Sequence, residues 1–166
     1  MNYRASFLAL ALMFAASVAF SQDKARVSSV TGRVTYAPSA TADFVPLTAG
    51  LEIPTGSRIR SGKDGTAVVI VVSGAAMQIS ENSEVTIDSM SSDTAKRKAL
   101  VSLKSGTVSA LIDPKRSKQT DFKIQTPQGV AAARGTFYGV TVKKGKTYVG
   151  VKKGKVGVAH TPDERS

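Results

Sequence analysis

The segment Thr66–Val72 reads Thr-Ala-Val-Val-Ile-Val-Val, a run of small and β-branched residues that favours an extended strand. Because both of its faces are apolar, this run predicts a central strand that is covered on two sides. In Glu84–Ser89 and Phe122–Gln125 apolar and polar residues alternate instead, which predicts strands with one face in water. No stretch keeps a 3.6-residue apolar period for three helical turns, so the sequence indicates an all-β protein.

Outward from this run, the chain divides into short apolar or alternating runs separated by Gly, Pro, Asn and Asp. Gly62–Gly65, Glu81–Ser83, Lys104–Gly106 and Lys143–Lys146 contain the small, polar or φ-positive residues that tight turns need. Many short strands at such spacing predict a β-roll, an irregular β-solenoid or a sandwich-like domain. The candidate strands are Arg26–Tyr36, Phe44–Leu47, Ser57–Arg60, Thr66–Val72, Ala75–Ile79, Glu84–Ser89, Ala99–Leu103, Thr107–Ile112, Phe122–Gln125, Thr136–Val142, Thr147–Val151 and Lys155–Ala159.

The first residues have the three-part layout of a secretory signal peptide. One positive charge, on Arg4, precedes the apolar run Phe7–Phe20, and small residues follow it. The run is too short for a comfortable membrane span, so we predict a signal peptide over residues 1–21, cleaved after Ser21 in preference to Ala19, and no transmembrane span in the mature chain. The expected β domain covers residues 26–159, a disordered tail covers 160–166, and the protein is exported to the periplasm or beyond the cell.

Composition excludes much of the usual catalytic chemistry. The 166-residue chain has no cysteine and one histidine, so disulfide frameworks, thiolate metal sites, Cys nucleophiles and multi-His sites are absent. Gly145-Lys-Thr147 resembles the end of a phosphate-binding loop, but its glycine spacing is wrong and no helix-forming sequence follows. His160 lies beside the C-terminal tail, where preorganisation for catalysis is poor. We therefore expect no enzymatic activity, no metal and no cofactor.

The positive charge is concentrated in the second half of the chain. Residues 22–93 contain 6 basic and 8 acidic side chains, whereas residues 94–160 contain 15 basic and 2 acidic ones. Six of these basic residues fall at what the pattern predicts to be successive hairpin turns, and they form a candidate basic rim for a polyanion: Lys143, Lys144, Lys146, Lys152, Lys153 and Lys155. The alternative is a solvated surface that serves solubility. Nucleic acid is not expected as a partner, because the nearby aromatic residues fall on apolar strand patterns.

The order of motifs from about Val27 to Val158 resembles the FecR-like domain family, named for a periplasmic regulator of iron-dicitrate transport. Four phrases carry this resemblance: Val30-Thr-Gly-Arg-Val34, Leu51-Glu-Ile-Pro-Thr-Gly-Ser-Arg-Ile-Arg-Ser61, Met77-Gln-Ile-Ser-Glu-Asn-Ser-Glu-Val-Thr-Ile87, and Leu103-Lys-Ser-Gly-Thr-Val108 leading to Phe122–Phe137. The resemblance implies a non-catalytic module of the cell envelope that docks another envelope protein. The alternative is electrostatic binding of anionic envelope polymers by the basic rim. The family's regulators also carry an anti-sigma segment and a membrane helix, which have no counterpart here, so sigma-factor relay is not expected.

The most specific phrase of the resemblance ends in Thr126-Pro127 and Arg134-Gly135-Thr136-Phe137. Pro127 fixes φ and suits the end of a strand, and Gly135 permits a bulge or a close backbone approach. Phe137 offers a large apolar anchor. Nothing in this signature requires a ligand, so its expected role is structural, with Arg134 as the residue whose guanidinium needs polar partners.

Overall fold

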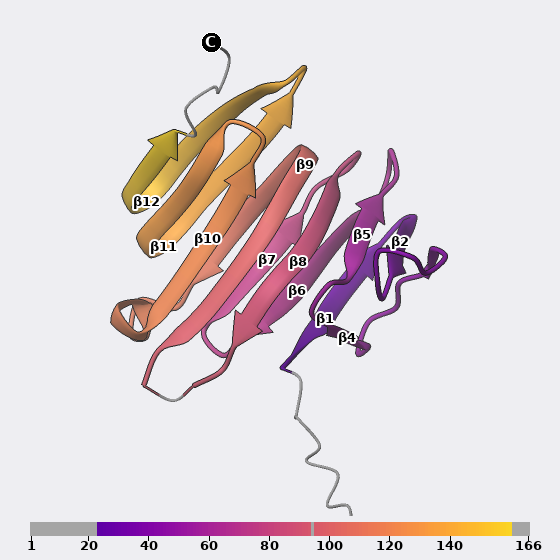
Figure 1. The fold of residues 1–166 in the computed structure, drawn as a ribbon, viewed down its shortest axis with the longest axis horizontal. Helices are drawn as coiled ribbons and strands as arrows, with labels where there is room; N and C mark the ends of the chain where they lie inside the picture. The colour runs from indigo at the N-terminus through magenta and orange to yellow at the C-terminus, as the bar shows by residue number, and fades with distance from the viewer. Residues whose placement is uncertain (1–22, 94, 161–166) are drawn as a thin grey trace, which may run out of the picture.

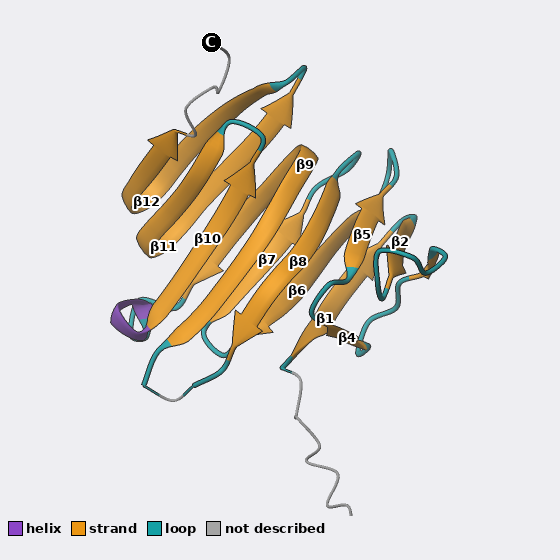
Figure 2. Cartoon of the chain, viewed as in Figure 1, coloured by secondary structure: helices purple, strands orange, loops and turns teal. Residues whose placement is uncertain are grey.

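The computed structural model describes residues 23–93 and 95–160, which form an all-β protein and confirm the predicted class (Figures 1 and 2). The strands are β1 (Lys24–Thr31), β2 (Val34–Ala37), β3 (Val45–Pro46), β4 (Glu52–Pro54), β5 (Arg58–Ser61), β6 (Thr66–Val72), β7 (Ala75–Ile79), β8 (Glu84–Ser91), β9 (Arg97–Ile112), β10 (Thr120–Thr126), β11 (Gly129–Lys143) and β12 (Lys146–His160). A single turn of 3₁₀ helix, η1 (Ser117–Gln119), precedes β10.

Strand β9 joins two halves of the sheet, one containing β3, β2, β5 and β8 and the other containing β7, β6, β1 and β4. It can do so because it changes neighbours near its middle. Residues 98–105 of β9 pair with β8 and residues 97–102 pair in parallel with β10, whereas residues 106–111 pair with β11 and residues 108–112 pair with β7. One path through the 12-stranded sheet therefore runs β3-β2-β5-β8-β9-β7-β6-β1-β4, and β10, β11 and β12 join it through β9. The sheet curls into a half-barrel, with β6 and β7 behind β8 and β9 in Figure 1.

The hydrophobic core lies between the two halves of this curled sheet. Alternate side chains from β6, β7, β8, β9, β10 and β11 enter it, including the fully buried Met77, Ile87, Phe122 and Tyr138. The alternation predicted for Glu84–Ser89 and Phe122–Gln125 is present, since Val85, Ile87, Phe122 and Ile124 are buried while Asp88 and Lys123 are exposed. Burial of this continuous apolar surface holds the two halves together.

The prediction that Thr66–Val72 is covered on both faces is wrong. This segment, β6, does lie inside the sheet between β1 and β7. Its inner residues Ala67, Val69 and Val71 are buried, but Ile70 on the other face is 40% exposed. Its β-branched residues suit the pleated strand whether or not the outer face is covered, so composition alone did not determine the number of packed layers.

Two predicted strand boundaries are also wrong, at positions where the chain passes between the halves. The predicted strand Arg26–Tyr36 is divided at Gly32, since β1 pairs with β4 and β6 while β2 pairs with β3 and β5. Conversely, Lys104–Gly106 does not form a turn, because β9 runs unbroken through it. Gly106 has a φ of +88°, which lets the strand bend there without ending.

A buried serine pair fixes this bend in β9. The Ser83 Oγ accepts a hydrogen bond from the Thr107 N–H at 2.9 Å and donates to the Thr107 carbonyl at 3.3 Å. The Ser61 Oγ accepts from the Ser83 N–H at 2.9 Å and donates to the Ser80 carbonyl at 2.5 Å. These bonds tie the end of β5 and the turn before β8 to the centre of β9, so they hold the bend in place.

The predicted signal peptide, residues 1–21, lies outside the described residues. Strand β12 continues to His160, and residues 161–166 of the predicted tail also lie outside the described residues. Among residues 23–93 and 95–160, no helix has the length and apolar character to cross a membrane.

Candidate functional site

The last strand, β12, forms one edge of the sheet. It is 15 residues long and, within the described part of the chain, it pairs with β11 only (Figure 1). The other side of such a strand presents unpaired N–H and C=O groups that can pair with another chain. An edge of this length is therefore a candidate surface for strand addition.

Apolar side chains along β12 are unusually exposed. Val151 and Val158 lie opposite Tyr138 and Ala131 of β11, whose side chains are buried, so both valines face the inner side of the sheet. They are nevertheless 46% and 60% exposed, and Tyr148 is 56% exposed. The inner face thus extends beyond the packed core at this edge, leaving apolar surface that a partner could cover.

The residues of the predicted basic rim do not lie at successive turns. Lys143, Lys144 and Lys146 are at the β11–β12 hairpin, where Lys144 and Gly145 have φ values of +50° and +71°, as a two-residue hairpin turn requires. The turn expected between the predicted strands Thr147–Val151 and Lys155–Ala159 is absent, because β12 is continuous from Lys146 to His160. Lys152 and Lys155 are exposed within the strand itself, and the described side chains do not include Lys153. The described basic residues therefore lie at the β11–β12 hairpin and along β12, and not at two successive turns.

Thr126 of the predicted signature connects three strands. Its hydroxyl donates to the Gly129 carbonyl at 3.1 Å and accepts from the Thr147 hydroxyl at 2.9 Å. The Gln128 side-chain oxygen accepts from the Thr147 N–H at 2.6 Å, across the same turn. The exposed Pro127 occupies this turn, after the last residue of β10. The network holds the start of β12 against the β10–β11 turn, so it orients the edge strand.

Gly135 lies in a bulge of β11. The pairing of β11 with β12 changes register between Arg134 and Phe137, and again between Phe137 and Tyr138. Phe137 is half-buried, and the Lys152 amine lies 5.8 Å from the centre of its ring. The described side chains do not include Arg134 or Thr136. Because the bulge bends β11 between its two halves, it also sets the course of β12.

A comparison with known protein families covers the strands that build this edge. The family described as FecR protein matches residues 57–157, which cover the strands from β5 through most of β12. The chain belongs to the FecR protein family. No curated protein and no solved structure matches it. The match includes the Thr126 network, the β11 bulge and most of the β12 edge, so these features are parts of a FecR domain.

Sequence reasoning missed Gln128 and Thr147 of this FecR domain. Both are ordinary polar residues, 19 positions apart, and the pairing of β11 with β12 is what brings them together. The only signal for them was their place beside predicted turns, where side-chain hydrogen bonds to backbone groups are common. A pairing register is needed to convert that signal into a contact.

The carboxylates near β8 do not converge on one point. Glu84 pairs with Arg60 and Lys104 at 3.3 and 3.6 Å, Asp88 accepts from the Ser102 hydroxyl at 2.6 Å, and Asp93 accepts from the Ala95 N–H at 3.0 Å. Within residues 23–93 and 95–160, no three His, Cys, Asp or Glu side chains gather at metal-binding distance. Each of these carboxylates has a local structural partner.

Tyr138 is the one described residue whose pKa departs clearly from its ordinary value. Burial raises the pKa of its phenol, and the negative charge of Asp121 raises it further. The Tyr138 hydroxyl donates to the Phe122 carbonyl at 3.2 Å inside the core. A neutral, hydrogen-bonded phenol in this position stabilises the contact between β10 and β11.

Proposed function

We propose that this FecR-family chain is an exported, non-catalytic module that docks another protein of the cell envelope along β12. The observation that carries the proposal is the 15-residue edge strand with exposed apolar side chains, in a family of regulatory, envelope-associated domains. The periplasm, or the space outside the cell, is the proposed location.

The proposed docking mode is strand addition. The partner segment would pair its backbone with the free side of β12, and it would cover Val151 and Val158 with its own apolar side chains. The Thr126 network and the β11 bulge support this mode because they hold β12 in one orientation before the partner arrives, which lowers the entropic cost of binding.

A photo-crosslinking experiment tests this proposal in cells. A photoreactive amino acid at the exposed Tyr148 should give a discrete crosslinked product with one envelope protein that survives high salt during extraction. The same amino acid at the exposed Ser39, near the opposite edge of the sheet, should not give that product. Equal products from both positions would refute docking along β12.

Proline substitutions test whether the backbone of β12 takes part. Successive N–H groups of an edge strand point alternately to its neighbour and to the free side. Of the variants Val149→Pro and Gly150→Pro, one should therefore lose a bond to β11 and stability, while the other should stay folded and lose the crosslinked product. If the folded variant keeps the product, strand addition is refuted even though a side-chain contact remains.

A second candidate function is electrostatic binding of anionic envelope polymers. The exposed lysines along β12 favour it: Lys143, Lys144, Lys146, Lys152 and Lys155. Such binding would fall steeply with salt, because exposed charges are screened over about 8 Å at physiological ionic strength. The test is capture of a polymer from envelope extract by the wild type and by a variant with six lysines changed to Ser: Lys143, Lys144, Lys146, Lys152, Lys153 and Lys155. If capture disappears both at high salt and in this variant, the result favours polymer binding over protein docking.

A further inference from the structure

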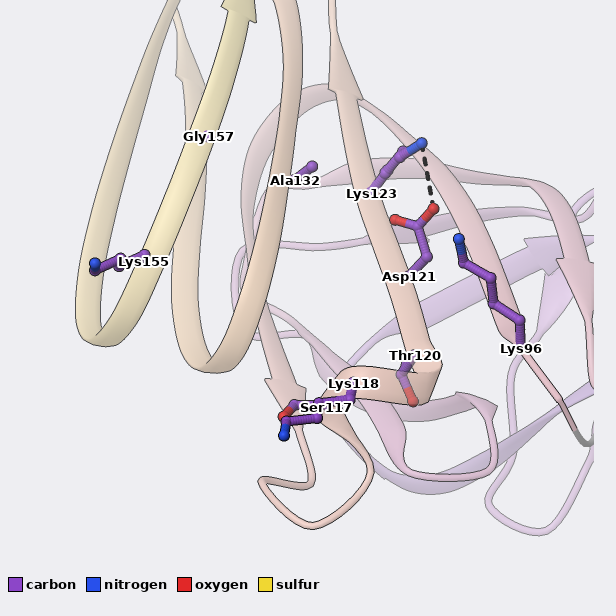
Figure 3. Close-up of a pocket in the computed structure, with 9 residues that line it drawn as sticks. All are labelled: Lys96, Ser117, Lys118, Thr120, Asp121, Lys123, Ala132, Lys155 and Gly157. Carbon is purple, nitrogen blue, oxygen red and sulfur yellow. Dashed lines mark ion pairs between the residues drawn. The ribbon is translucent and has the colours of Figure 1, made fainter.

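A hollow beside β10 gathers lysines that are far apart in the sequence. Its volume is about 630 Å³, and Lys96, Lys118, Lys123 and Lys155 line it (Figure 3). They come from four segments: the residues before β9, helix η1, β10 and β12. Three of these four lysines lie outside the basic rim that the sequence predicted.

The hollow carries an excess of positive charge. Its lining includes four lysines and one carboxylate, Asp121, whose Oδ2 lies 3.3 Å from the Lys123 Nζ. Figure 3 shows this pair with Lys96 beside it, while the Lys155 side chain extends from β12 away from them. Among the described residues, no ion pair engages Lys96, Lys118 or Lys155. The lysines that line this concave space raise the local concentration of anions and favour a doubly charged group such as a phosphate monoester.

A second hollow, of about 590 Å³, adjoins the first and is mainly apolar. The two share Lys123, Ala132 and Gly157. Beyond these shared residues, the second hollow is lined by Leu100, Val130, Val158 and Ala159, together with Gln125. Of these residues Val158 is at the margin of the hollow, because it lies opposite the buried Ala131 and its side chain faces the inner side of the sheet. The two hollows therefore form one groove with a basic end and an apolar end.

Strand register explains why the groove is continuous. Leu100 of β9, Lys123 of β10, Ala132 of β11 and Gly157 of β12 are successive cross-strand neighbours. Their chain neighbours Val101, Phe122, Ile124 and Ala131 are buried, so this row lies on the opposite, outer face of the sheet. Ala132 and Gly157 have little or no side chain, and the surface is hollowed where they meet.

From these contacts we propose that the groove binds a single-chain lipid with a phosphate headgroup. The lysine end holds the phosphate by charge-assisted hydrogen bonds, and the acyl chain lies over Ala132, Gly157, Val130 and Ala159. A phosphate alone would leave the apolar end exposed, and a neutral chain would leave the lysines unpaired. This proposal goes beyond docking along β12 and does not depend on it, since it uses the outer face of the sheet and docking uses the free edge and the inner face.

Calorimetric titration of the protein, as purified from expressing cells, tests the proposal with three kinds of probe below their micellar concentrations. Lysophosphatidates with acyl chains of increasing length should bind, each added methylene strengthening binding roughly twofold to fourfold until the chain exceeds the groove. Lysophosphatidylcholine has the same chain but no net charge, and it should bind at least tenfold more weakly. Glycerol 3-phosphate has the headgroup without the chain, and it should also bind at least tenfold more weakly.

Two variants with matched controls locate the binding. Lys96→Ser/Lys118→Ser should weaken lysophosphatidate binding at least tenfold, whereas Lys143→Ser/Lys146→Ser removes the same charge at the β11–β12 hairpin and should change it less than twofold. Gly157→Leu should remove the dependence on chain length, because it fills the groove where its two ends meet. A Cβ at Gly157 meets nothing closer than 3.9 Å, so this variant should fold, and Gly150→Leu on the same strand is its control, with nothing within 4 Å.

Four results would overturn the proposal. Glycerol 3-phosphate binding as tightly as lysophosphatidate would show a site for an anionic headgroup alone, and equal binding of lysophosphatidylcholine would show that charge is irrelevant. Equal weakening by both double lysine variants would assign binding to diffuse surface charge. A folded Gly157→Leu variant with unchanged binding and chain dependence would place the lipid elsewhere. None of these results affects crosslinking at Tyr148, so the two proposals fail separately.

Discussion

Replacement of Gly106 by Ala should severely destabilise the protein, because this glycine allows β9 to pass between the two halves of the sheet. Its φ is +88°, and a Cβ there would overlap the Ser83 Oγ and lie 2.5 Å from the Ser83 Cα. Because the second of these atoms belongs to the backbone of the turn before β8, a change of side-chain rotamer cannot relieve the overlap. Either β9 or this turn must shift.

The size of the effect follows from three contributions. Left-handed backbone strain on an alanine costs roughly 1–2 kcal/mol, and forced displacement in a packed region costs about 1–3 kcal/mol. The shift would also break the 2.9 Å hydrogen bond from the Thr107 N–H to the Ser83 Oγ, which contributes about 1 kcal/mol. The expected loss of about 3–6 kcal/mol is a large part of the roughly 5–15 kcal/mol by which domains are usually stable.

Urea unfolding followed by circular dichroism measures this loss against two matched glycine variants. Gly145→Ala has a φ of +71° but nothing within 4 Å, so it should lose only the roughly 1–2 kcal/mol of backbone strain. Gly150→Ala has neither feature and should gain up to about 1 kcal/mol, because alanine loses less entropy in a strand. If Gly106→Ala loses no more free energy of unfolding than Gly145→Ala, the close approach of β9 to Ser83 does not hold the fold together.

Three further substitutions test the core and the surface. Tyr138→Phe should cost about 1 kcal/mol at neutral pH through the lost bond to the Phe122 carbonyl. Because burial, and then Asp121, raise the Tyr138 pKa, the native phenol stays protonated while the unfolded one ionises near pH 10, so stability falls above about pH 10. Urea unfolding from about pH 9 to 11.5 measures this loss. The free energy of unfolding should fall with pH more steeply in the wild type than in Tyr138→Phe, by up to about 1.4 kcal/mol per pH unit. Parallel curves would contradict the assignment of this loss to Tyr138. Phe122→Ala should lower the free energy of unfolding by about 3–5 kcal/mol, measured by urea, and a loss below about 1 kcal/mol would mean that the core closes over the cavity. Glu84→Gln removes ion pairs to Arg60 and Lys104 and should cost below about 1 kcal/mol in the same assay, since both basic partners are solvent-exposed, and a loss above about 2 kcal/mol would contradict that reasoning.

Local patterns in the sequence were sufficient for the fold class and for several turns. The alternation in Phe122–Gln125 predicted the buried faces correctly, and Lys143–Lys146 forms the hairpin turn that its composition indicates. The predicted role of Gly135 in a bulge agrees with the change of register between Arg134 and Phe137. Each of these features is decided by residues close together in the chain, where propensity and side-chain period act directly.

The errors occur where distant segments decide the structure. A glycine with positive φ can either end a strand at a turn or bend a strand that continues. For Gly106, only the close approach to Ser83 shows that the strand bends and continues. Gly154, between Lys152 and Lys155, favours a turn, but pairing with β11 keeps that segment extended. The lysine hollow could not be predicted at all, because it depends on the parallel pairing of β10 with β9 and on the course of β12.

The lysines of β12 also bear on what can pair with its free edge. A second copy of the chain adding antiparallel along the whole of β12 would bring Lys152 and Lys155 of the two copies close together, and like charges on neighbouring strands are destabilising. Lysines on an edge are a known means of preventing self-association. The same charges attract an acidic segment, so they discriminate between a second copy and a foreign strand. The oligomeric state in solution tests this. A β12–β12 dimer of the wild type at physiological salt would show that this discrimination is absent. If the wild type is monomeric and the variant with Lys146, Lys152 and Lys155 changed to Ser dimerises, the lysine charges are what prevent self-pairing at β12.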